Sequence, residues 1–562
     1  MELKQGLNTR LINSNGTMPV SDRRRSPFWK WWITVFLIFA AIEICWSLAT
    51  PLFASPDEPT QVIKAVATLR GEFIGKPFPG PIQANTIVRV PKTFVDGSIP
   101  VCFAHKPTIP AGCAPVVHAS GQVVTATTYV GRYPPLYYLL SGWPSLFSSS
   151  TWVIYAMRFA SGLATAAMIA LAFAVAARWS RSRLLPTGIA LAAVPSLLFL
   201  GSVVNPSGLE IAAGLATWTC GAVLVFDGGP HPPKGLVVCT ALSASVFALI
   251  RGLSPFWVVL IGLLLLLVAG RDSSREWFQD FGIRVLIVVV SVVGLLAVAW
   301  ILFAHALAFG PIFNAVSAKA PPIRVFSAIL GESWLQVGHM IGRFGWNDTS
   351  APALTLFIWM FALGAFIGLG LSAGSYRLGV VLLVTILLVI IVPALLTLAS
   401  SHQDGQIWQA RYGLPFAVGV PILASAGIRD LRLSKRLGIF VALGVGIAQI
   451  ATFIEVLQRY VEGLNSDPYS GFLYPFAKVP NGWVPPLPPL VLTGLFSLCM
   501  MCAVVMFIKM TLRAIPILPL GAQGASESQI GSDGRDHEIL EDPDSEERNL
   551  CEAESEGPKA TK

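Results

Sequence analysis

The stretch Ser55-Pro56-Asp57-Glu58-Pro59 places two acids just beyond the first long apolar segment, where a long hydrophilic loop begins. Ser55 suits the N-cap of a helix, and Pro56 fits the first helical position, where its missing N–H is not needed. Glu58 stands three residues after Ser55, the spacing of a capping box. The pattern predicts a helix over about residues 56–74.

This expected helix has one apolar and one polar line of side chains, so we expect it to lie on a membrane or protein surface rather than to cross the bilayer. The apolar line consists of Val62, Val66, Leu69 and Phe73, and the polar line of Gln61, Lys64, Thr68 and Glu72.

The two acids have a structural and a chemical interpretation. Acids are favoured at the positive end of a helix, and Glu58 also has the capping task. Asp57 has no such task. It lies at the membrane boundary in a loop that is otherwise poor in acids, which favours a chemical role. We therefore take Asp57, with Glu58 beside it, as the candidate catalytic carboxylates.

The composition excludes a soluble protein. Of the 562 residues 54% are hydrophobic and only 12% are charged, and the mean hydropathy is +0.66, which is typical of a polytopic membrane protein. The net charge of +8 combines a balance of −8 in residues 521–562 with +16 in the remainder. The basic residues form short clusters beside apolar runs, which indicates topology signals and no nucleic-acid surface.

The apolar runs predict an all-α polytopic membrane protein with about twelve transmembrane helices. Arg23-Arg24-Arg25 and Lys30 precede the first run and favour a cytoplasmic N-terminus and an uncleaved first span, with a cleaved signal peptide as the alternative. Segment 134–147 is too short to cross, so it is expected to be a second interfacial helix. The expected spans are 31–50, 151–178, 184–203, 206–226, 235–250, 254–269, 282–306, 352–371, 378–399, 413–427, 437–457 and 487–509.

Three parts of the chain follow from this pattern. Residues 1–30 form a cytoplasmic segment, and residues 31–510 a transmembrane domain with a large extracytoplasmic loop at 51–150. Residues 511–562 are acidic and poor in aromatics, which predicts a disordered cytoplasmic tail. We expect a multi-pass protein of the bacterial cytoplasmic membrane with both termini cytoplasmic.

Cys102 and Cys113 share one Pro-rich segment of the first outer loop. If this loop is extracytoplasmic, a disulfide between them is expected. The other cysteines lie in apolar spans or in the tail, and we expect no metal site.

Three motifs carry a resemblance to known proteins: Ser55-Pro56-Asp57-Glu58-Pro59, Gly201-Ser-Val-Val-Asn-Pro-Ser-Gly-Leu-Glu210 and Gln409-Ala-Arg-Tyr-Gly-Leu-Pro415. They resemble the bacterial membrane-protein family named domain of unknown function 2142, over roughly residues 30–510. The order of first span, acid-bearing outer loop and interfacial helices also resembles the GT-C superfamily of polyprenyl-phosphate-sugar-dependent glycosyltransferases.

The GT-C resemblance implies inverting transfer of a sugar from a polyprenyl-phosphate donor, with Asp57 as general base or as the carboxylate that positions the acceptor. The leaving phosphate calls for a cation, for which Arg411 is the first candidate, followed by Arg343 and His339. Arg411 also has a structural interpretation, as an arginine at the membrane interface whose side chain reaches lipid headgroups. Trp and Tyr are also common at membrane interfaces for structural reasons. The candidate cavity residues are Asn205, Glu210, His402, Trp408 and Tyr412.

Many GT-C enzymes carry a further acid in the second outer turn, where this chain has Asn205-Pro206-Ser207. The resemblance therefore gives no support for a divalent metal, and no cofactor is expected. The expected partners are a polyprenyl-phosphate sugar, a cell-envelope glycan, lipid or protein acceptor, and membrane lipids. The alternatives are a transporter or flippase for lipid-linked sugars and a non-catalytic envelope assembly protein. The sugar and the acceptor stay open.

Overall fold

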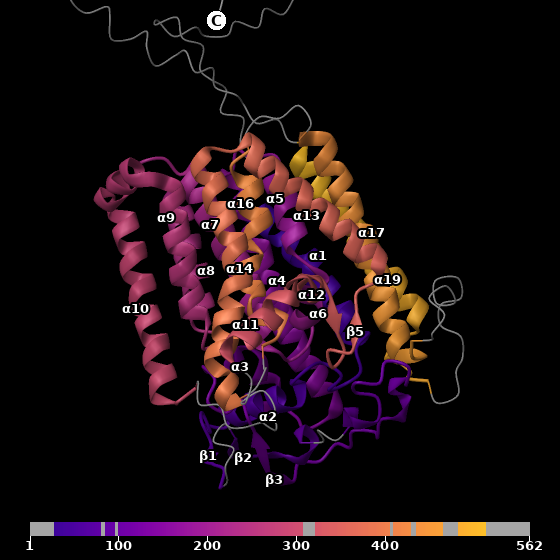
Figure 1. The fold of residues 1–562 in the computed structure, drawn as a ribbon. Coiled ribbons are helices and arrows are strands. Elements are labelled where there is room, and N and C mark those ends of the chain that lie inside the picture. The colour runs from indigo at the N-terminus through magenta and orange to yellow at the C-terminus, as the bar shows by residue number, and fades with distance from the viewer. Residues whose placement is uncertain are drawn as a thin grey trace, which may run out of the picture. The chain divides into compact units, whose positions relative to one another are not determined.

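The computed structural model describes residues 27–79, 85–95, 99–306, 321–404, 408–428, 434–464 and 482–512. In this part of the chain, long helices stand side by side, and a smaller layer of short elements covers one end of them (Figure 1). The expected acidic tail lies outside the described residues beyond residue 512, as does the N-terminal segment before residue 27.

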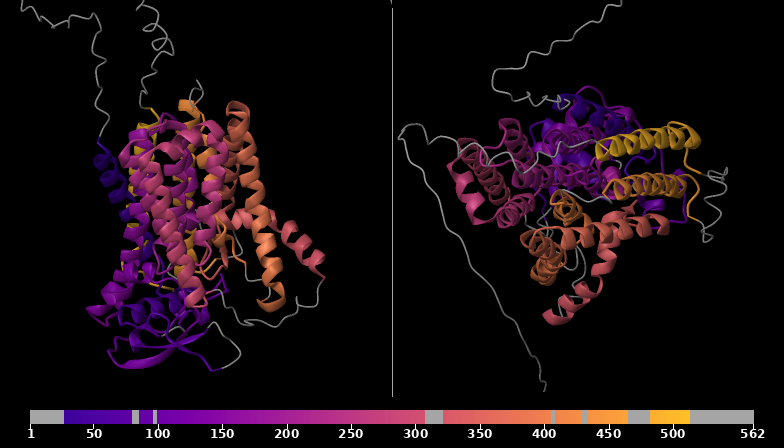
Figure 2. Two further views of the ribbon diagram at one scale, coloured as in Figure 1. Left: turned by 90° about the vertical axis from the view of Figure 1, so that its left-hand side faces the viewer. Right: turned by 90° about the horizontal axis from the view of Figure 1, so that it is seen from above.

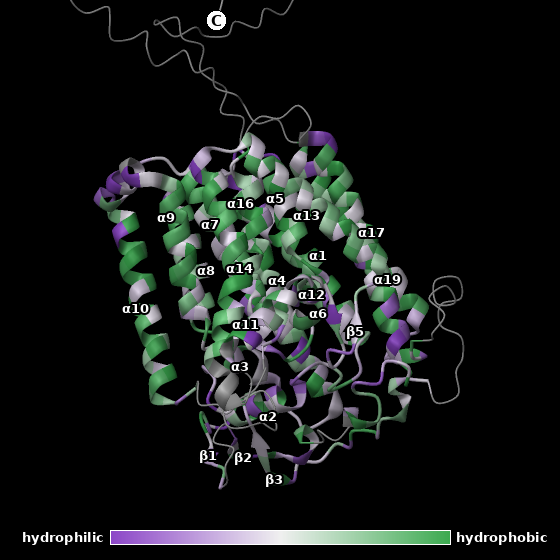
Figure 3. Cartoon of the chain, in the orientation of Figure 1, coloured by the Kyte–Doolittle hydropathy of each residue, from purple (hydrophilic) through white to green (hydrophobic). Residues whose placement is uncertain are grey.

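Nine helices of the described part are long and apolar enough to cross a membrane. They agree with nine of the expected spans, because an uninterrupted apolar run satisfies its backbone most simply as a helix. Figure 3 shows these helices as predominantly hydrophobic along their length. They are α1 (Phe28–Leu48), α4 (Thr151–Trp179), α7 (Pro206–Asp227), α9 (Ser254–Gln279), α10 (Phe281–Phe303), α13 (Ala353–Ala373), α14 (Tyr376–Asp404), α17 (Ser434–Val461) and α19 (Pro489–Thr511).

The other three expected spans are shorter or broken. The run 184–203 divides at Ala193 and Val194 into α5 (Leu185–Ala192) and α6 (Pro195–Gly201), because Pro195 has no N–H to continue the helix. The run 235–250 forms the 15-residue helix α8 (Lys234–Ala248). The run 413–427 forms α15 (Leu414–Ala417) and α16 (Gly419–Ala426), preceded by the 3-10 turn η6 (Ala410–Tyr412).

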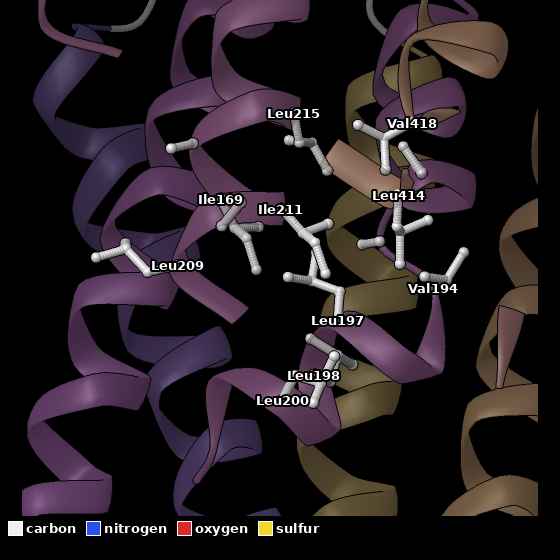
Figure 4. Packing of buried hydrophobic residues seen from close by; sticks show 14 of the residues in the cluster. Ile169, Val194, Leu197, Leu198, Leu200, Leu209, Ile211, Leu215, Leu414 and Val418 are labelled. Atoms are coloured by element: carbon white, nitrogen blue, oxygen red, sulfur yellow. The ribbon is translucent and has the colours of Figure 1, made fainter. Parts of the chain in front are cut away.

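The broken span lies inside the bundle, where side chains of the neighbouring helices surround it in place of lipid. Leu197, Leu198 and Leu200 of α6 pack near Ile211 of α7 (Figure 4). Every residue of α5 and α6 is buried. At another part of the bundle, α17 and α19 lie side by side (Figure 2).

The first loop forms the layer at one end of the bundle. It contains a three-stranded antiparallel sheet in the order β1-β2-β3, with Val88 opposite Ala126. This sheet was not predicted from the sequence, although its two longer strands alternate buried and exposed residues. The elements of the loop are α2 (Glu58–Leu69), β1 (Lys76–Pro77), β2 (Thr86–Pro91), η1 (Lys92–Phe94), η2 (Ile99–Cys102), η3 (Ala111–Cys113), β3 (Val123–Thr128), α3 (Leu136–Gly142) and η4 (Trp143–Leu146).

Helix α2 corrects two expectations. It begins at Glu58 and ends at Leu69, so it is shorter than predicted. Of its expected polar line, Gln61, Lys64 and Thr68 are buried instead of exposed, whereas Glu72 lies beyond the helix and is partly exposed. The protein supplies the missing partners: Lys64 Nζ donates to the carbonyl oxygens of Phe73 and Gly131, and Gln61 Oε1 accepts from the Tyr138 hydroxyl at 2.6 Å. Helix α3 with η4 forms the short helical segment expected at 134–147, which is too short to cross a bilayer.

A second irregular segment precedes α13. Helices α11 (Pro322–Gly331) and α12 (Ser333–Ile341) lead into a short hairpin of β4 (Arg343–Phe344) and β5 (Thr349–Ser350). Helix α12 packs against η6, which carries Arg411.

Candidate functional site

Asp57 occupies the N-cap position of α2 in the left-handed conformation, with φ 63°. Its side chain makes no capping hydrogen bond, and the buried hydroxyl of Ser55 has no partner in the described part of the chain. The expected capping box is therefore wrong. The helix begins two residues later than predicted, and this leaves the Asp57 carboxylate available for tertiary contacts.

Glu58 does not act as the capping partner of Ser55. It is fully buried, and its two carboxylate oxygens accept from Arg158 Nε and Nη2 at 2.7 and 2.6 Å. Oε1 also accepts from the backbone N–H of Val204 at 3.2 Å. Glu58 thus joins the first loop to α4 and to the segment before α7, and this pairing positions the neighbouring Asp57.

The Asp57 carboxylate receives two donors from distant parts of the chain. Arg411 Nη2 of η6 donates to Oδ2, and the hydroxyl of Tyr129 donates to Oδ1. Burial is the main reason that the pKa of Tyr129 is raised, and the Asp57 charge adds to it, so Tyr129 stays a donor. The Asp57 side chain keeps 23% of its surface exposed, so the carboxylate is accessible from the protein surface.

Arg411 is the most distinctive group of the site. Its side chain is only 7% exposed, and its Nε and Nη1 atoms are buried without a hydrogen-bond partner among the described residues. Burial opposes its charge, but Asp57 and Tyr412 beside it hold the pKa of Arg411 above its ordinary range. Arg411 is therefore a permanent cation with donors in reserve.

A second cation, Arg251, lies close by. Its guanidinium carbon is 4.7 Å from the ring centre of Tyr412 and 5.7 Å from that of Tyr133, and Arg411 lies 5.3 Å from the same Tyr412 ring. Arg251 Nη1 donates to Ser207 at 3.0 Å and to Glu210 at 3.4 Å. Tyr412 thus lies against both cations.

Two of the expected cavity residues, Glu210 and Asn205, support this site from α7. Glu210 is buried and accepts from Arg251 and from the Ser254 hydroxyl, the latter at 2.8 Å. Asn205 caps α7 through the N–H of Ser207 at 3.0 Å, and its Nδ2 donates to the carbonyl oxygen of Pro56 at 2.9 Å. Asn205 therefore fixes the turn that presents Asp57.

Of the other predicted residues, Trp408 contacts this cluster, whereas His339 and Arg343 bond to other groups. Trp408 stacks edge to face on Tyr412 with ring centres 5.7 Å apart, and it lines a cavity of about 90 Å³ between α12 and α14. Burial, with Arg343 nearby, lowers the pKa of His339, which disfavours its charged form as a phosphate ligand. Arg343 Nη1 donates to Ser350 at 2.7 Å.

His402 falls in the last turns of α14, and its side chain lies outside the described part of the structure. No three potential metal ligands of the His, Cys, Asp or Glu type come together among the described residues.

Cys102 and Cys113 are joined by a disulfide, the pairing expected from the sequence. Arg459 of α17 holds the same loop through the carbonyl oxygens of Phe103 and Ile109 at 2.8 and 2.9 Å. Its Nη2 also donates to Asp348 at 2.9 Å.

Three residues of the site were not predicted from the sequence: Tyr129, Arg158 and Arg251. For Arg158 a signal existed, because a charged residue inside an apolar span usually has a buried partner. Tyr129 and Arg251 carry no comparable local signal, since their roles depend on contacts 72 residues away with Asp57 and 41 residues away with Glu210.

The helices and this cluster define a polytopic membrane protein with a carboxylate–arginine site where an extramembrane layer meets the bundle. The chain belongs to the family described as predicted membrane protein (DUF2142), whose model matches residues 39–420.

Two solved structures are similar to the chain at low identity. ArnT from Cupriavidus metallidurans bound to undecaprenyl phosphate is 13% identical with a TM-score of 0.37, and the match covers 85% of this chain and 77% of that chain. ArnT from the same organism in the apo state is 13% identical with a TM-score of 0.36 over the same shares. No protein among the curated sequences compared with this chain matches it.

Proposed function

We propose that this protein is a glycosyltransferase that moves a sugar from a polyprenyl-phosphate donor to a hydroxyl group of a cell-envelope acceptor, on the outer face of the bacterial cytoplasmic membrane. The observation that carries the proposal is the Asp57–Arg411 pair, in which two nitrogen atoms of a buried arginine, Nε and Nη1, have no partner among the described residues. Such donors suit an anionic ligand, and a phosphate accepts them well.

In this reaction Asp57 is the general base. The acceptor oxygen attacks the sugar C1 atom, the bond from C1 to the phosphate oxygen breaks, and the acceptor proton passes to Asp57. The products are the glycosylated acceptor and the free polyprenyl phosphate. Inversion at C1 follows from a single displacement.

The pairing of Asp57 with Arg411 couples the two ends of this step. As Asp57 takes up the proton, it no longer neutralises Arg411, and the guanidinium charge becomes available to the phosphate as its negative charge develops. The Tyr412 ring contacts both Arg411 and Arg251, so Arg251 adds a second positive charge close to the pair. The buried Glu210 holds Arg251 in place.

The test uses purified protein and a panel of radiolabelled polyprenyl-phosphate sugars, with release of the lipid phosphate as readout. Wild-type protein is expected to release it from at least one donor. Asp57→Asn should lower turnover about 10²–10⁴-fold, because an amide accepts no proton at neutral pH. Asn tolerates the left-handed conformation of this position, so the variant should fold.

The matched control is Glu72→Gln, which removes an acid from the same layer but from a partly exposed pair with Arg89. Its turnover should equal that of the wild type. Wild-type turnover by Asp57→Asn would refute the base assignment, and no release from any donor of the panel would refute the transferase.

The division of the run 184–203 into α5 and α6 favours a second candidate function. Broken helices inside a bundle are a feature of transporters, so a transporter or flippase of lipid-linked sugars is the alternative. Reconstituted vesicles with a fluorescent polyprenyl-phosphate sugar distinguish the two. Movement of the lipid across the bilayer without sugar release supports the alternative.

A further inference from the structure

Helix α1 carries an acid within its membrane-spanning part. Glu43 is 1% exposed, and neither of its carboxyl oxygens has a hydrogen-bond partner among the described residues. Ionisable residues inside spans are rare, because an unpaired charge is costly there, and they commonly mark functional sites. The carboxylate–arginine site does not use Glu43.

Two glycines make room for this side chain. A Cβ atom on Gly201, at the end of α6, would lie 2.8 Å from Glu43 Oε1 and 3.0 Å from Oε2. A Cβ atom on Gly162 of α4 would lie 2.9 Å from the Cβ atom of Glu43. The carboxyl group therefore occupies a fitted slot between three helices.

No cation of the described residues neutralises the group. The nearest charged residue along α4 is Arg158, one turn from Gly162, and its five N–H groups are all engaged. Two donate to Glu58, and three donate to the carbonyl oxygens of Ser47, Thr50 and Pro51.

The remaining contacts of the slot are also uncharged. Thr165 of α4 has its methyl group beside Gly201, and its hydroxyl donates to the Ser161 carbonyl oxygen at 3.1 Å. Helix α19 also packs on α1, and there its Cys499 thiol faces Cys45. A carboxylate at Glu43 would thus be unpaired in an apolar environment, whereas a carboxylic acid fits.

We propose that Glu43 is a proton-binding site inside the membrane domain. It carries a proton in the folded protein and is linked to the arrangement of the carboxylate–arginine site. The ligand is a proton, and its binding requires no other reactant.

The link from Glu43 to the carboxylate–arginine site passes through a few hydrogen bonds. Ser47 lies one turn after Glu43 on α1, and its hydroxyl donates to the carbonyl oxygen of Ser202, next to Gly201. Two residues further, the N–H of Val204 donates to Glu58. Ionisation of Glu43 would force α1 away from Gly201 and disturb the segment that positions the acids of the first loop.

The first test compares the folding equilibria of wild-type protein and Glu43→Gln in detergent between about pH 5.5 and 8. Above about pH 5 the unfolded chain carries an ionised glutamate, so folding of the wild type takes up one proton and becomes less favourable as the pH rises. Glutamine needs no proton. The ratio of the two folding constants should change tenfold per pH unit in favour of Glu43→Gln.

The control is Glu72→Gln, whose ratio to the wild type should stay nearly constant over this range because Glu72 is partly exposed and paired with Arg89. A pH-independent ratio for Glu43→Gln would overturn the proposal. The readout is stability, so the result does not depend on glycosyl transfer.

The second test uses dicyclohexylcarbodiimide, an apolar reagent to which a protonated carboxyl adds its O–H across a C=N bond; the adduct then rearranges to a stable N-acylurea. Peptide mass spectrometry should find the adduct at Glu43 and none at Glu58, which is equally buried but ion-paired. Labelling at Glu58 and not at Glu43 would contradict the assignment.

Discussion

Replacing Glu58 by Gln should destabilise the protein strongly, although the change keeps the size of the side chain and one acceptor oxygen. In the folded protein the Glu58–Arg158 pair is fully buried, and Arg158 directs two of its five hydrogen bonds to the Glu58 carboxylate. The substitution leaves the guanidinium charge without a counter-charge and places an amide NH₂ against one of its donors.

The magnitude follows from the burial of the pair. Removing one partner of a buried ion pair costs about 3–5 kcal/mol, because the other charge stays buried and unpaired. Glu72→Gln serves as the matched control: the Arg89–Glu72 pair has a distance of 3.3 Å but is 77% and 26% exposed. Breaking an exposed pair should cost about 0–1 kcal/mol.

The assay is denaturant titration of the purified protein in mixed micelles, followed by tryptophan fluorescence, for both variants at one pH. Adding Arg158→Gln to Glu58→Gln should cost less than the sum of the single changes, with a coupling of about 0.5–3 kcal/mol. Equal stability of Glu58→Gln and Glu72→Gln would refute the assignment of the buried pair as a structural clamp.

Burial lowers the pKa of Lys64 from 10.5 to about 7, and the neutral amine has two N–H groups for the two carbonyl oxygens that it contacts. Between these values the unfolded chain binds the proton and the folded protein does not, so the free energy of unfolding of the wild type should rise with pH from about 7 relative to that of Lys64→Met, by at most about 1.4 kcal/mol per pH unit; a difference between the two proteins that stays constant with pH would contradict this. Reduction of the Cys102–Cys113 disulfide should cost about 3 kcal/mol of stability in the chain-entropy model, and mass spectrometry of freshly alkylated, non-reduced protein that found both thiols free would reject the bond. For the topology, a cysteine engineered near Asp96 should react with a membrane-impermeant reagent in intact spheroplasts, and protection there with labelling of the tail would reverse the predicted orientation.

The helical architecture could be predicted because the hydropathy signal is local. The runs 151–178 and 206–226 became α4 and α7 almost at the predicted bounds. Hydropathy alone did not show the break before Pro195, since the residues on both sides are apolar, although the proline itself was a sign of it. The small sheet was missed because its strands are short and lie in a loop rich in proline.

The candidate site was only partly predictable. Asp57 and Arg411 were singled out separately from their sequence surroundings, and the fold brings them into contact. The role of Glu58 was misjudged, because its spacing from Ser55 satisfies a capping rule while a tertiary contact 100 residues away is stronger. A motif thus shows which residues deserve attention, but the competing partners of a buried charge become visible only in three dimensions.

The contact between Asp57 and Arg411 spans 354 residues and therefore has a consequence for biogenesis. At a synthesis rate of about 5–20 residues per second, the ribosome adds Arg411 roughly 20–70 s after Asp57. During that interval the first loop can fold, and Glu58 can already pair with Arg158, while the carboxylate of Asp57 still lacks its arginine. A nascent chain that stalls before η6 would thus insert most of its helices and yet remain unable to assemble the pair.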